Sequence, residues 1–353
     1  MNTVENIKAG AGAAGSLSVG GASPQPEKVG VMLVNLGTPD GFEFKPMWRY
    51  LREFLSDRRV IEEPRLKWYP ILYGIVLNTR PSKSGANYRK IWNYELNESP
   101  LLTLTRSQND KLAAALADLP NVVVDFAMRY GNPSLESVAN KLTSQGCTRL
   151  LVLPLYPQYS ATTTATVNDK LFQALMKMRY MPALRSVPAY YNEPLYIDAL
   201  ARSIESHLAT LDFEPEVVLA SYHGIPKSYA EKGDPYADHC HETTRLLRQR
   251  LGWDEGRLIT TFQSLFGRAE WVKPYTDKTV ERLASEGVKS IAIVNPGFAA
   301  DCIETLEEIA QEVAGIYADA GGENFSHIPC LNDTPEGMAV IEMLVRRELS
   351  GWI

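Results

Sequence analysis

A lone histidine lies at the end of a short apolar segment in the second half of the chain. Residues 217–222 read VVLASY, which is apolar and short enough for a buried strand, and His223 follows directly. Gly224 and Pro226 then end the extended run. A single histidine is more often structural than catalytic. An imidazole at the end of a strand can nevertheless accept a proton or ligate a metal near neutral pH.

Three carboxylates form a second group of candidate residues. Asp301, Glu304 and Glu308 are spaced i, i+3 and i+7, so on a helix they make one acidic face. Such a face can simply be solvated, with its first turn stabilised by the helix dipole. If it faces a cleft, it supplies oxygen ligands or proton carriers. Together with His223 it would then form a mixed nitrogen and oxygen site that suits a divalent transition metal.

Aromatic residues gather near predicted strand ends. They are Tyr88, Trp92, Tyr94, Tyr130, Tyr156, Tyr159, Tyr222 and Trp271. Some must belong to the core, but many at strand ends would line a flat apolar cleft. Arg80 and Arg129 could hold the carboxylates of a ligand there, or could pair with surface acids.

Other metal motifs are weak. Residues 238–241 read DHCH, but adjacent side chains on a helix splay about 100° apart, which disfavours a metal site. The four cysteines, Cys147, Cys240, Cys302 and Cys330, lie far apart without a CxxC pair, which disfavours a zinc ribbon or a redox motif. Without a secretory signal, we expect reduced thiols in the cytoplasm.

Alternating strand and helix patterns predict an α/β protein. Apolar runs of strand length occur at residues 31–36, 122–128, 150–155, 185–190, 217–222, 258–262 and 291–294, and helical patterns separate them. A weak internal repeat relates residues 146–154 to 287–295. We therefore expect two similar Rossmann-like domains, each a parallel sheet flanked by helices, at residues 30–183 and 184–335. Residues 336–353 are expected to form a C-terminal helix that could pack on the first domain.

In such sheets the ligand lies beyond the carboxyl ends of the strands, which predicts a cleft between the two domains. The loops at these ends are rich in glycine, proline and aromatic residues. Neither GxGxxG nor GxxxxGK[ST] occurs, so a nucleotide site would lack its usual phosphate-binding loop.

Composition narrows the classes of partner. The 353 residues carry a net charge of −6, with 45% hydrophobic and 22% charged residues, which argues against a nucleic-acid binder. Residues 1–29 are mostly Gly, Ala, Ser and Pro and are expected to be a disordered leader. No stretch of 18 apolar residues occurs. Residues 70–77, PILYGIVL, could be a buried helix or an apolar lip that touches a bilayer or an apolar substrate.

Together these segments resemble the ferrochelatase family. SYHGIP at 221–226 and GDPY at 233–236 are similar to its signature segment. LVNLGTP at 33–39, MRYGNP at 128–133, LYPQYS at 155–160, FQS at 262–264 and DCIET at 301–305 resemble further landmarks in family order. The resemblance covers about residues 30–335. It implies the chelatase fold and the insertion of ferrous iron into a porphyrin.

The resemblance also implies roles for residues. His223 would be the metal ligand and the acceptor of pyrrole protons, Glu304 its acidic partner across the cleft, and Asp301 and Glu308 a path for protons or metal. Positions near the porphyrin would be Leu36, Arg80, Tyr88, Ser99, Arg129 and Trp271. Cys302 stands where some members have histidine. The counterpart segment at 159–161 and the tail lack cysteines that hold a 2Fe–2S cluster in some members, so we expect no cluster and no tightly bound cofactor.

The function that this resemblance implies is formation of protohaem from Fe²⁺ and protoporphyrin IX, the last step of haem biosynthesis. We expect the protein in the cytoplasm, where residues 70–77 could make a peripheral contact with the membrane. Three alternatives stay open: a chelatase that inserts cobalt or nickel into another tetrapyrrole, a non-catalytic haem or porphyrin carrier, and a two-domain periplasmic-type solute binder. The sequence does not distinguish protoporphyrin from coproporphyrin and does not fix the oligomeric state.

Overall fold

Two parallel sheets of four strands each form the frame of the protein. The computed structural model describes residues 27–267 and 269–353. The first sheet has the order β2-β1-β3-β4, and the second has the order β6-β5-β7-β8. The strands are β1 Lys28–Thr38, β2 Val122–Gly131, β3 Cys147–Pro154, β4 Ala183–Ser186, β5 Val217–His223, β6 Leu258–Gln263, β7 Ser290–Val294 and β8 Asn324–Ile328.

The two sheets repeat one topology, as the internal sequence repeat predicts. In each sheet the first strand along the chain pairs with the second on one side and the third on the other, and every pairing is parallel. β3 and β7, which carry the two halves of the sequence repeat, occupy equivalent positions. The α/β fold with two similar units is therefore confirmed.

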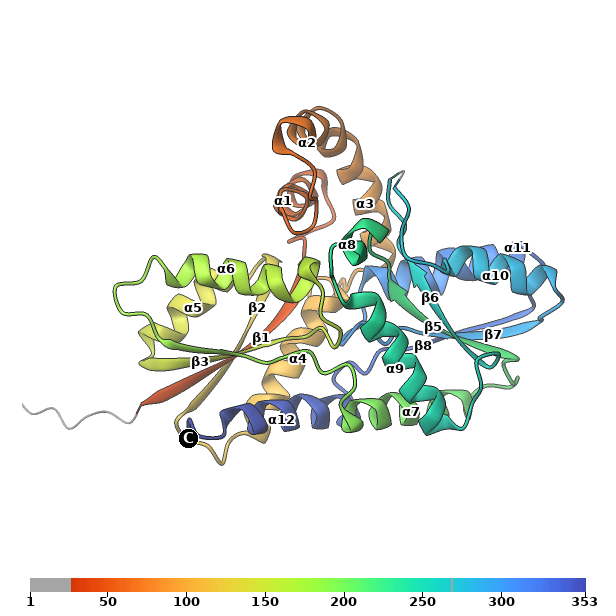
Figure 1. The fold of residues 1–353 in the computed structure, drawn as a ribbon. Helices are drawn as coiled ribbons and strands as arrows, with labels where there is room; N and C mark the ends of the chain where they lie inside the picture. The colour runs from red at the N-terminus through yellow and green to blue at the C-terminus, as the bar shows by residue number, and fades with distance from the viewer. Residues whose placement is uncertain (1–26, 268) are drawn as a thin grey trace, which may run out of the picture.

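Helices cover the faces of both sheets (Figure 1). In the first half they are α1 Phe44–Leu55, α2 Arg65–Ile71, the π-helix η1 Leu72–Val76, α3 Leu77–Ile91, α4 Pro100–Ala115, α5 Leu135–Ser144, the π-helix η2 Ala161–Ala165 and α6 Thr166–Leu175. In the second half they are α7 Pro194–Leu208, α8 Lys227–Glu231, α9 Tyr236–Leu251, α10 Thr276–Ser285, the π-helix η3 Glu304–Val313, α11 Ala314–Asp319 and α12 Pro335–Leu349. The segment from α1 to α3 projects from the first sheet above the region between the two sheets (Figure 1).

Alternate residues of the central strands enter different cores. In β1, Val31 and Leu33 contribute to one cluster, whereas Met32 and Val34 contribute to another, and all four are fully buried. This follows from the two-residue period of a strand that helices cover on both faces. The first cluster also contains residues of β5 and β7, so one hydrophobic core runs through both halves of the protein.

One predicted strand lies across the expected boundary between the two domains. The expected strand at 185–190 is β4, Ala183–Ser186, and it pairs with β3 in the first sheet. A boundary between residues 183 and 184 therefore falls inside the first sheet. β8 was not predicted because its sequence, NFSHI, mixes polar and apolar residues, as suits an edge strand that is only partly buried.

The C-terminal helix α12 lies against the first half of the chain as well as against α7. Its contacts include α4 and β3. Arg346 on α12 pairs with Asp118 at 2.9 Å, and Arg149 on β3 donates to the Trp352 carbonyl at 2.6 Å.

A buried ion pair anchors the projecting segment to the first sheet. Asp57 follows α1, and its carboxylate accepts hydrogen bonds from Arg129 and Tyr130 of β2 and from Thr166 at the start of α6. The Arg129 side chain is only 9% exposed, and its Nε also donates to the Thr166 carbonyl at 3.0 Å. Arg129 therefore pairs with a buried acid of the protein, and not with a surface acid as its second predicted role stated.

The charge of Asp57 is stabilised by these contacts. Burial alone would raise the pKa of the carboxyl, but hydrogen bonds from Thr166 and the Arg59 backbone, with the Arg129 charge, hold this pKa below its usual value. A carboxyl whose pKa is lowered on folding contributes stability above its unfolded pKa and loses it as the pH falls through the folded value.

We predict that Asp57→Asn lowers the free energy of unfolding by roughly 3–5 kcal/mol at pH 7, because it leaves the buried Arg129 charge without its partner. The deficit should begin to shrink as the pH falls below about 4, where the Asp57 carboxyl of the unfolded wild-type chain becomes protonated, and should be lost below the lowered pKa of the folded state. Denaturant unfolding at pH 7 and at pH 3.5 measures both effects. Asp118→Asn, at an exposed ion pair, serves as the control and should change stability much less. An equal deficit at both pH values would contradict the assignment.

Candidate active site

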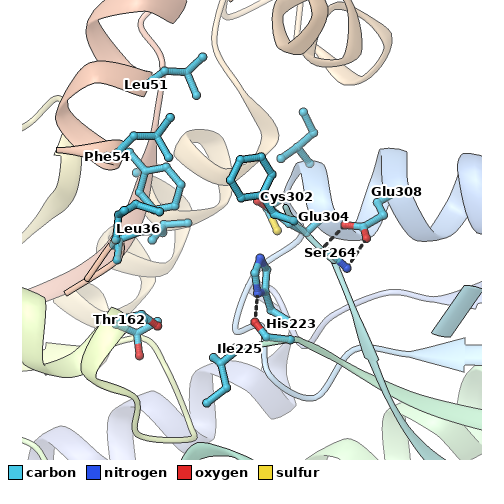
Figure 2. Close-up of a pocket in the computed structure, with 18 of the residues that line it drawn as sticks. Leu36, Leu51, Phe54, Thr162, His223, Ile225, Ser264, Cys302, Glu304 and Glu308 are labelled. Carbon is cyan, nitrogen blue, oxygen red and sulfur yellow. Dashed lines mark hydrogen bonds between the residues drawn. The ribbon is translucent and has the colours of Figure 1, made fainter. Parts of the chain in front are cut away.

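A cavity of about 1270 Å³ lies between the two sheets. Residues 35–37 near the C-terminal end of β1 and residues after β3, β5, β6 and β7 line it, as expected for the carboxyl ends of parallel strands. The segment from α1 to α3 supplies another wall, where Leu51, Phe54, Trp68 and Ile71 contribute apolar side chains. Figure 2 shows the apolar wall of Leu36, Leu51 and Phe54 across the cavity from Glu304 and Glu308. The cavity thus combines a large apolar surface with a few polar groups, as ligand sites usually do.

His223 is the last residue of β5 and lines this cavity. Its Nδ1 lies 2.6 Å from the Gly224 carbonyl oxygen, a hydrogen bond that Figure 2 marks. A carbonyl oxygen only accepts, so Nδ1 must carry the proton and Nε2 must hold a lone pair when the ring is neutral. In Figure 2 the ring points towards the part of the cavity where Cys302 and Glu304 lie. His223 can therefore accept a proton or bind a metal through Nε2.

Glu304 and Glu308 belong to the π-helix η3 and line the part of the cavity across from the apolar wall. Glu308 accepts hydrogen bonds from the Ser264 backbone N–H and hydroxyl, both at 2.6 Å. Burial raises the pKa of the Glu308 carboxyl above its usual value and the Glu304 charge adds to this, although hydrogen bonds from Ser264 and the attraction of His223 oppose the shift. A raised pKa lets Glu308 hold a proton closer to neutral pH, which suits a proton carrier.

A buried amide joins the strand of His223 to the acidic helix. Gln263, at the end of β6, accepts hydrogen bonds from Ser221 Oγ at 2.7 Å and from Asn295 Nδ2 at 2.8 Å. Its Nε2 donates to the Glu304 carbonyl at 2.8 Å and to Glu308 at 3.4 Å. Gln263 was not predicted as a site residue, and its place in the FQS segment at 262–264 was the available signal.

One residue of the predicted acidic face, Asp301, lies away from the cavity. Asp301 precedes η3, is only 5% exposed and does not line the cavity. Its carboxylate accepts from Asn332 Nδ2 at 2.6 Å and from Thr305 Oγ1 at 2.8 Å, so it holds the start of η3 to the loop after β8. The helical spacing does not extend to Asp301 because the helix begins only after it, with the π-helix at Glu304.

Two further carboxylates of the π-helix η3 line the cavity and were not predicted. Glu312 follows Glu308 by four residues, the same interval that separates Glu304 from Glu308, and this repeat was the available signal. Glu307 is buried and pairs with Lys90 at 2.6 Å and with Asn87 at 2.9 Å, both on α3. No short sequence pattern indicates the Glu307 contacts, because α3 lies more than two hundred residues earlier in the chain.

Five of the six residues expected near the ligand line the cavity. They are Leu36, Arg80, Tyr88, Ser99 and Trp271, and the exception is Arg129. Burial lowers the pKa of Arg80, and its guanidinium lies 4.1 Å from the ring centre of Phe266. Among the described residues Arg80 has no carboxylate within ion-pair distance, which leaves it able to bind an anionic group.

Most of the aromatic residues considered at strand ends point elsewhere. Of these eight, Tyr88, Tyr156 and Trp271 line the cavity. Tyr130 and Tyr222 are fully buried in the core, whereas Tyr94 is 64% exposed. The direction of each side chain depends on its register in a strand or helix, which composition near a strand end does not fix.

Cys302 also lines the cavity, beside Glu304. Burial and the Glu304 charge raise the pKa of its thiol well above the usual value. The thiol is therefore protonated near neutral pH, and the thiolate is the form that binds metals. Within residues 27–267 and 269–353, no three His, Cys, Asp or Glu side chains form a group that could enclose a metal ion.

None of the helices in the described ranges is both long and apolar enough to cross a membrane. The segment from α2 through η1 carries several exposed apolar residues, one of which lines the cavity. Ile71 is 39% exposed and lines the cavity as well, while Leu66 and Ile75 are 94% and 60% exposed.

Comparison with known proteins identifies the family. The ferrochelatase family model matches residues 28–349. The chain is 71% identical over 337 residues to the ferrochelatase of Mesorhizobium japonicum, covering 96% of each protein. It is 69% identical over 333 residues to the ferrochelatase of a Chelativorans species, covering 94% of each.

Solved structures show the same fold at low sequence identity. SirB from Bacillus subtilis, solved with Fe³⁺, is 12% identical with a TM-score of 0.54, covering 92% of this chain and 97% of that chain. The cavity between two parallel sheets, its histidine and carboxylates, and the match along nearly the whole sequence agree. The chain therefore belongs to the ferrochelatase family.

Proposed function

We propose that this chain inserts Fe²⁺ into protoporphyrin IX to form protohaem, with His223 and Glu304 as the residues that act on the reacting groups. The observation that carries the proposal is the placement of the His223 ring. Its Nδ1 donates to the Gly224 carbonyl, which puts the lone pair of the neutral ring on Nε2, and the ring lines a cavity that Glu304 also lines. Family membership supplies the class of reaction, and this geometry supports the assignment of roles.

The apolar wall and Arg80 would bind the macrocycle. A porphyrin is flat and apolar, with carboxylates at its edge, and side chains such as Leu36, Phe54 and Trp271 suit its faces. Arg80 would pair with a propionate, since burial and the lack of a partner acid among the described residues favour an anionic ligand. Binding at this edge could offset the cost of bending the ring, which exposes the nitrogen lone pairs.

His223 would then accept the protons of the macrocycle. Free porphyrin carries two N–H protons, and Fe²⁺ binds the four nitrogens only as these protons leave. His223 Nε2 can take one proton at a time, and the hydrogen bond from Nδ1 to Gly224 remains donated when the ring becomes charged.

Glu304 would bind Fe²⁺ and pass it to the ring. Iron is a substrate here, so a site with few protein ligands is useful because a tightly held metal would not transfer. Glu308 and Glu312 continue from Glu304 along η3 and would carry protons or iron between the ring and solvent. Glu312 replaces Asp301 in the path that the sequence predicted.

A peripheral contact with a membrane forms part of the proposal, for a protein that otherwise resides in the cytoplasm. Tyr69, Ile71, Tyr73 and Ile75 expose apolar surface at the edge of the cavity, whereas Leu72 packs inside. A porphyrin is poorly soluble in water, so an apolar edge beside the cavity would allow transfer to or from a bilayer.

We predict that His223→Ala lowers the rate of iron insertion by about 10²–10⁴-fold because it removes the proton acceptor. Protoporphyrin should still bind, since the apolar wall is unchanged. Anaerobic absorbance measures haem formation, and porphyrin fluorescence measures binding. His207→Ala, on α7 outside the cavity, is the control. Turnover by His223→Ala close to that of the control would refute the assigned role.

We predict that the wild-type protein sediments with anionic phospholipid vesicles and that Leu66→Glu with Ile75→Glu weakens this binding at least several-fold. These two positions are exposed, so the substitutions add charge without opening the core. The matched control is Phe172→Glu with Met176→Glu, which charges an exposed apolar area at the end of α6. If wild-type protein does not sediment with vesicles, the membrane contact is wrong.

A further inference from the structure

The segment that follows His223 crosses from the second half of the protein to the first. It contains α8, Lys227–Glu231, and continues to Asp234 before α9 begins. Ser228, Tyr229 and Lys232 line the cavity from this side. Its contacts with the first half fall at two places, on either side of Gly233, whose φ of +99° favours glycine.

The first place is a junction with the segment between α1 and α2. The Tyr229 hydroxyl donates to the Val60 carbonyl at 3.1 Å and accepts from the Glu62 backbone N–H, also at 3.1 Å. Lys232 adds an ion pair with the Glu62 carboxylate. We call these four residues the Tyr229 latch. Because residues 60–64 also line the cavity, the latch joins two of its walls directly.

The second place is a firmer attachment. The Asp234 carboxylate accepts from Ser160 Oγ at 2.9 Å and from the Ala161 backbone N–H at 2.8 Å. Hydrogen bonds to an ionised group are roughly twice as strong as neutral ones. The hydroxyl of Tyr229 makes only neutral hydrogen bonds, and the Lys232 side chain is 63% exposed, so its ion pair is weak.

The difference in strength between the two attachments indicates which of them breaks first. If the wall formed by residues 60–64 moves away from α8, the Tyr229 latch breaks while Asp234 stays attached beyond Gly233. No contact of Asp234 involves residues 60–64. Breaking the latch would therefore separate these two walls without dislodging the strand that carries His223.

We propose that the Tyr229 latch positions the wall of residues 60–64 and limits the rate at which the macrocycle enters and leaves the cavity. The proposal rests on the proposed function for the identity of the ligand. It assigns Tyr229 and Lys232 as positioning residues, acting through Val60 and Glu62.

Stopped-flow fluorescence of metal-free protoporphyrin with the full-length protein tests the latch. Tyr229→Phe removes both hydrogen bonds and keeps the ring, so association and dissociation rates should each rise about tenfold, as expected from the loss of two neutral hydrogen bonds. The ratio of the two rates should change much less. Tyr317→Phe is the matched control, since its hydroxyl bonds the Val288 carbonyl at 2.9 Å within the second half and outside the cavity.

Association and dissociation rates of protoporphyrin in Tyr229→Phe within twofold of wild type would overturn the latch. Equal acceleration of these rates in Tyr317→Phe would also overturn it, because the effect would then not be specific to the latch. Thermal unfolding of both variants accompanies the kinetics, because a structural defect alone would lower stability without a selective change in exchange. Wild-type protein that binds protoporphyrin but forms no haem would refute the proposed function and leave the latch standing. Wild-type protein that binds no protoporphyrin would refute both.

Lys232→Met gives an independent measurement if Tyr229→Phe does not fold. Because the ion pair with Glu62 is exposed, we expect an increase in exchange rates of less than about threefold at low salt. The increase should vanish at high salt, where the wild-type ion pair is screened. Lys278→Met, whose partner Glu281 lies on the same helix, is the control. An effect of Lys232→Met no larger than that of the control would count against the latch.

Discussion

The side-chain amide of Gln263 is the contact on which the arrangement of the site most depends. Its oxygen is held by Ser221, two residues before His223, and its nitrogen holds the Glu304 carbonyl. The histidine strand and the acidic helix are thereby connected through one buried group that is only 4% exposed. A buried amide without hydrogen bonds costs free energy. The arrangement that satisfies every hydrogen bond of Gln263 is therefore favoured over others.

The parallel sheets explain why these groups meet at all. β5, β6 and β7 end at the same edge, which brings His223, Gln263 and Asn295 together although they are distant in sequence. The equivalent edge of the first sheet faces the same cavity and contributes Leu36 and Tyr156. The segment from α1 to α3 then supplies an apolar wall, and the Asp57–Arg129 pair fixes its base to the sheet.

Sequence alone was sufficient for the features that follow from local pattern. Continuous apolar runs indicated the central strands, and the position of His223 directly after one of them located the cavity edge. Glu304 and Glu308 were found because carboxylates repeat at helical intervals. Both features can be read from a few consecutive residues, because they depend on the spacing of residues along one element and on where a strand ends.

The failures depend on contacts between distant residues. Asp301 continues the acidic row in sequence, but it precedes η3, and its carboxylate accepts hydrogen bonds from Asn332 and Thr305 away from the cavity. Arg129 resembles a ligand-binding arginine, and only the fold reveals that Asp57 neutralises it. The expected boundary between residues 183 and 184 falls within β4, which belongs to the first sheet through its pairing with β3 and not through its own sequence.

The most direct measurement is anaerobic insertion of Fe²⁺ into protoporphyrin by Glu304→Gln, followed by visible absorbance and compared with wild type. The substitution keeps the size of the side chain and the backbone carbonyl that Gln263 holds, but removes the charge that would bind iron. The account predicts that protoporphyrin still binds and that haem formation falls by about 10²-fold or more. Haem formation at the wild-type rate would contradict it, because the carboxylate facing His223 would then have no part in the reaction.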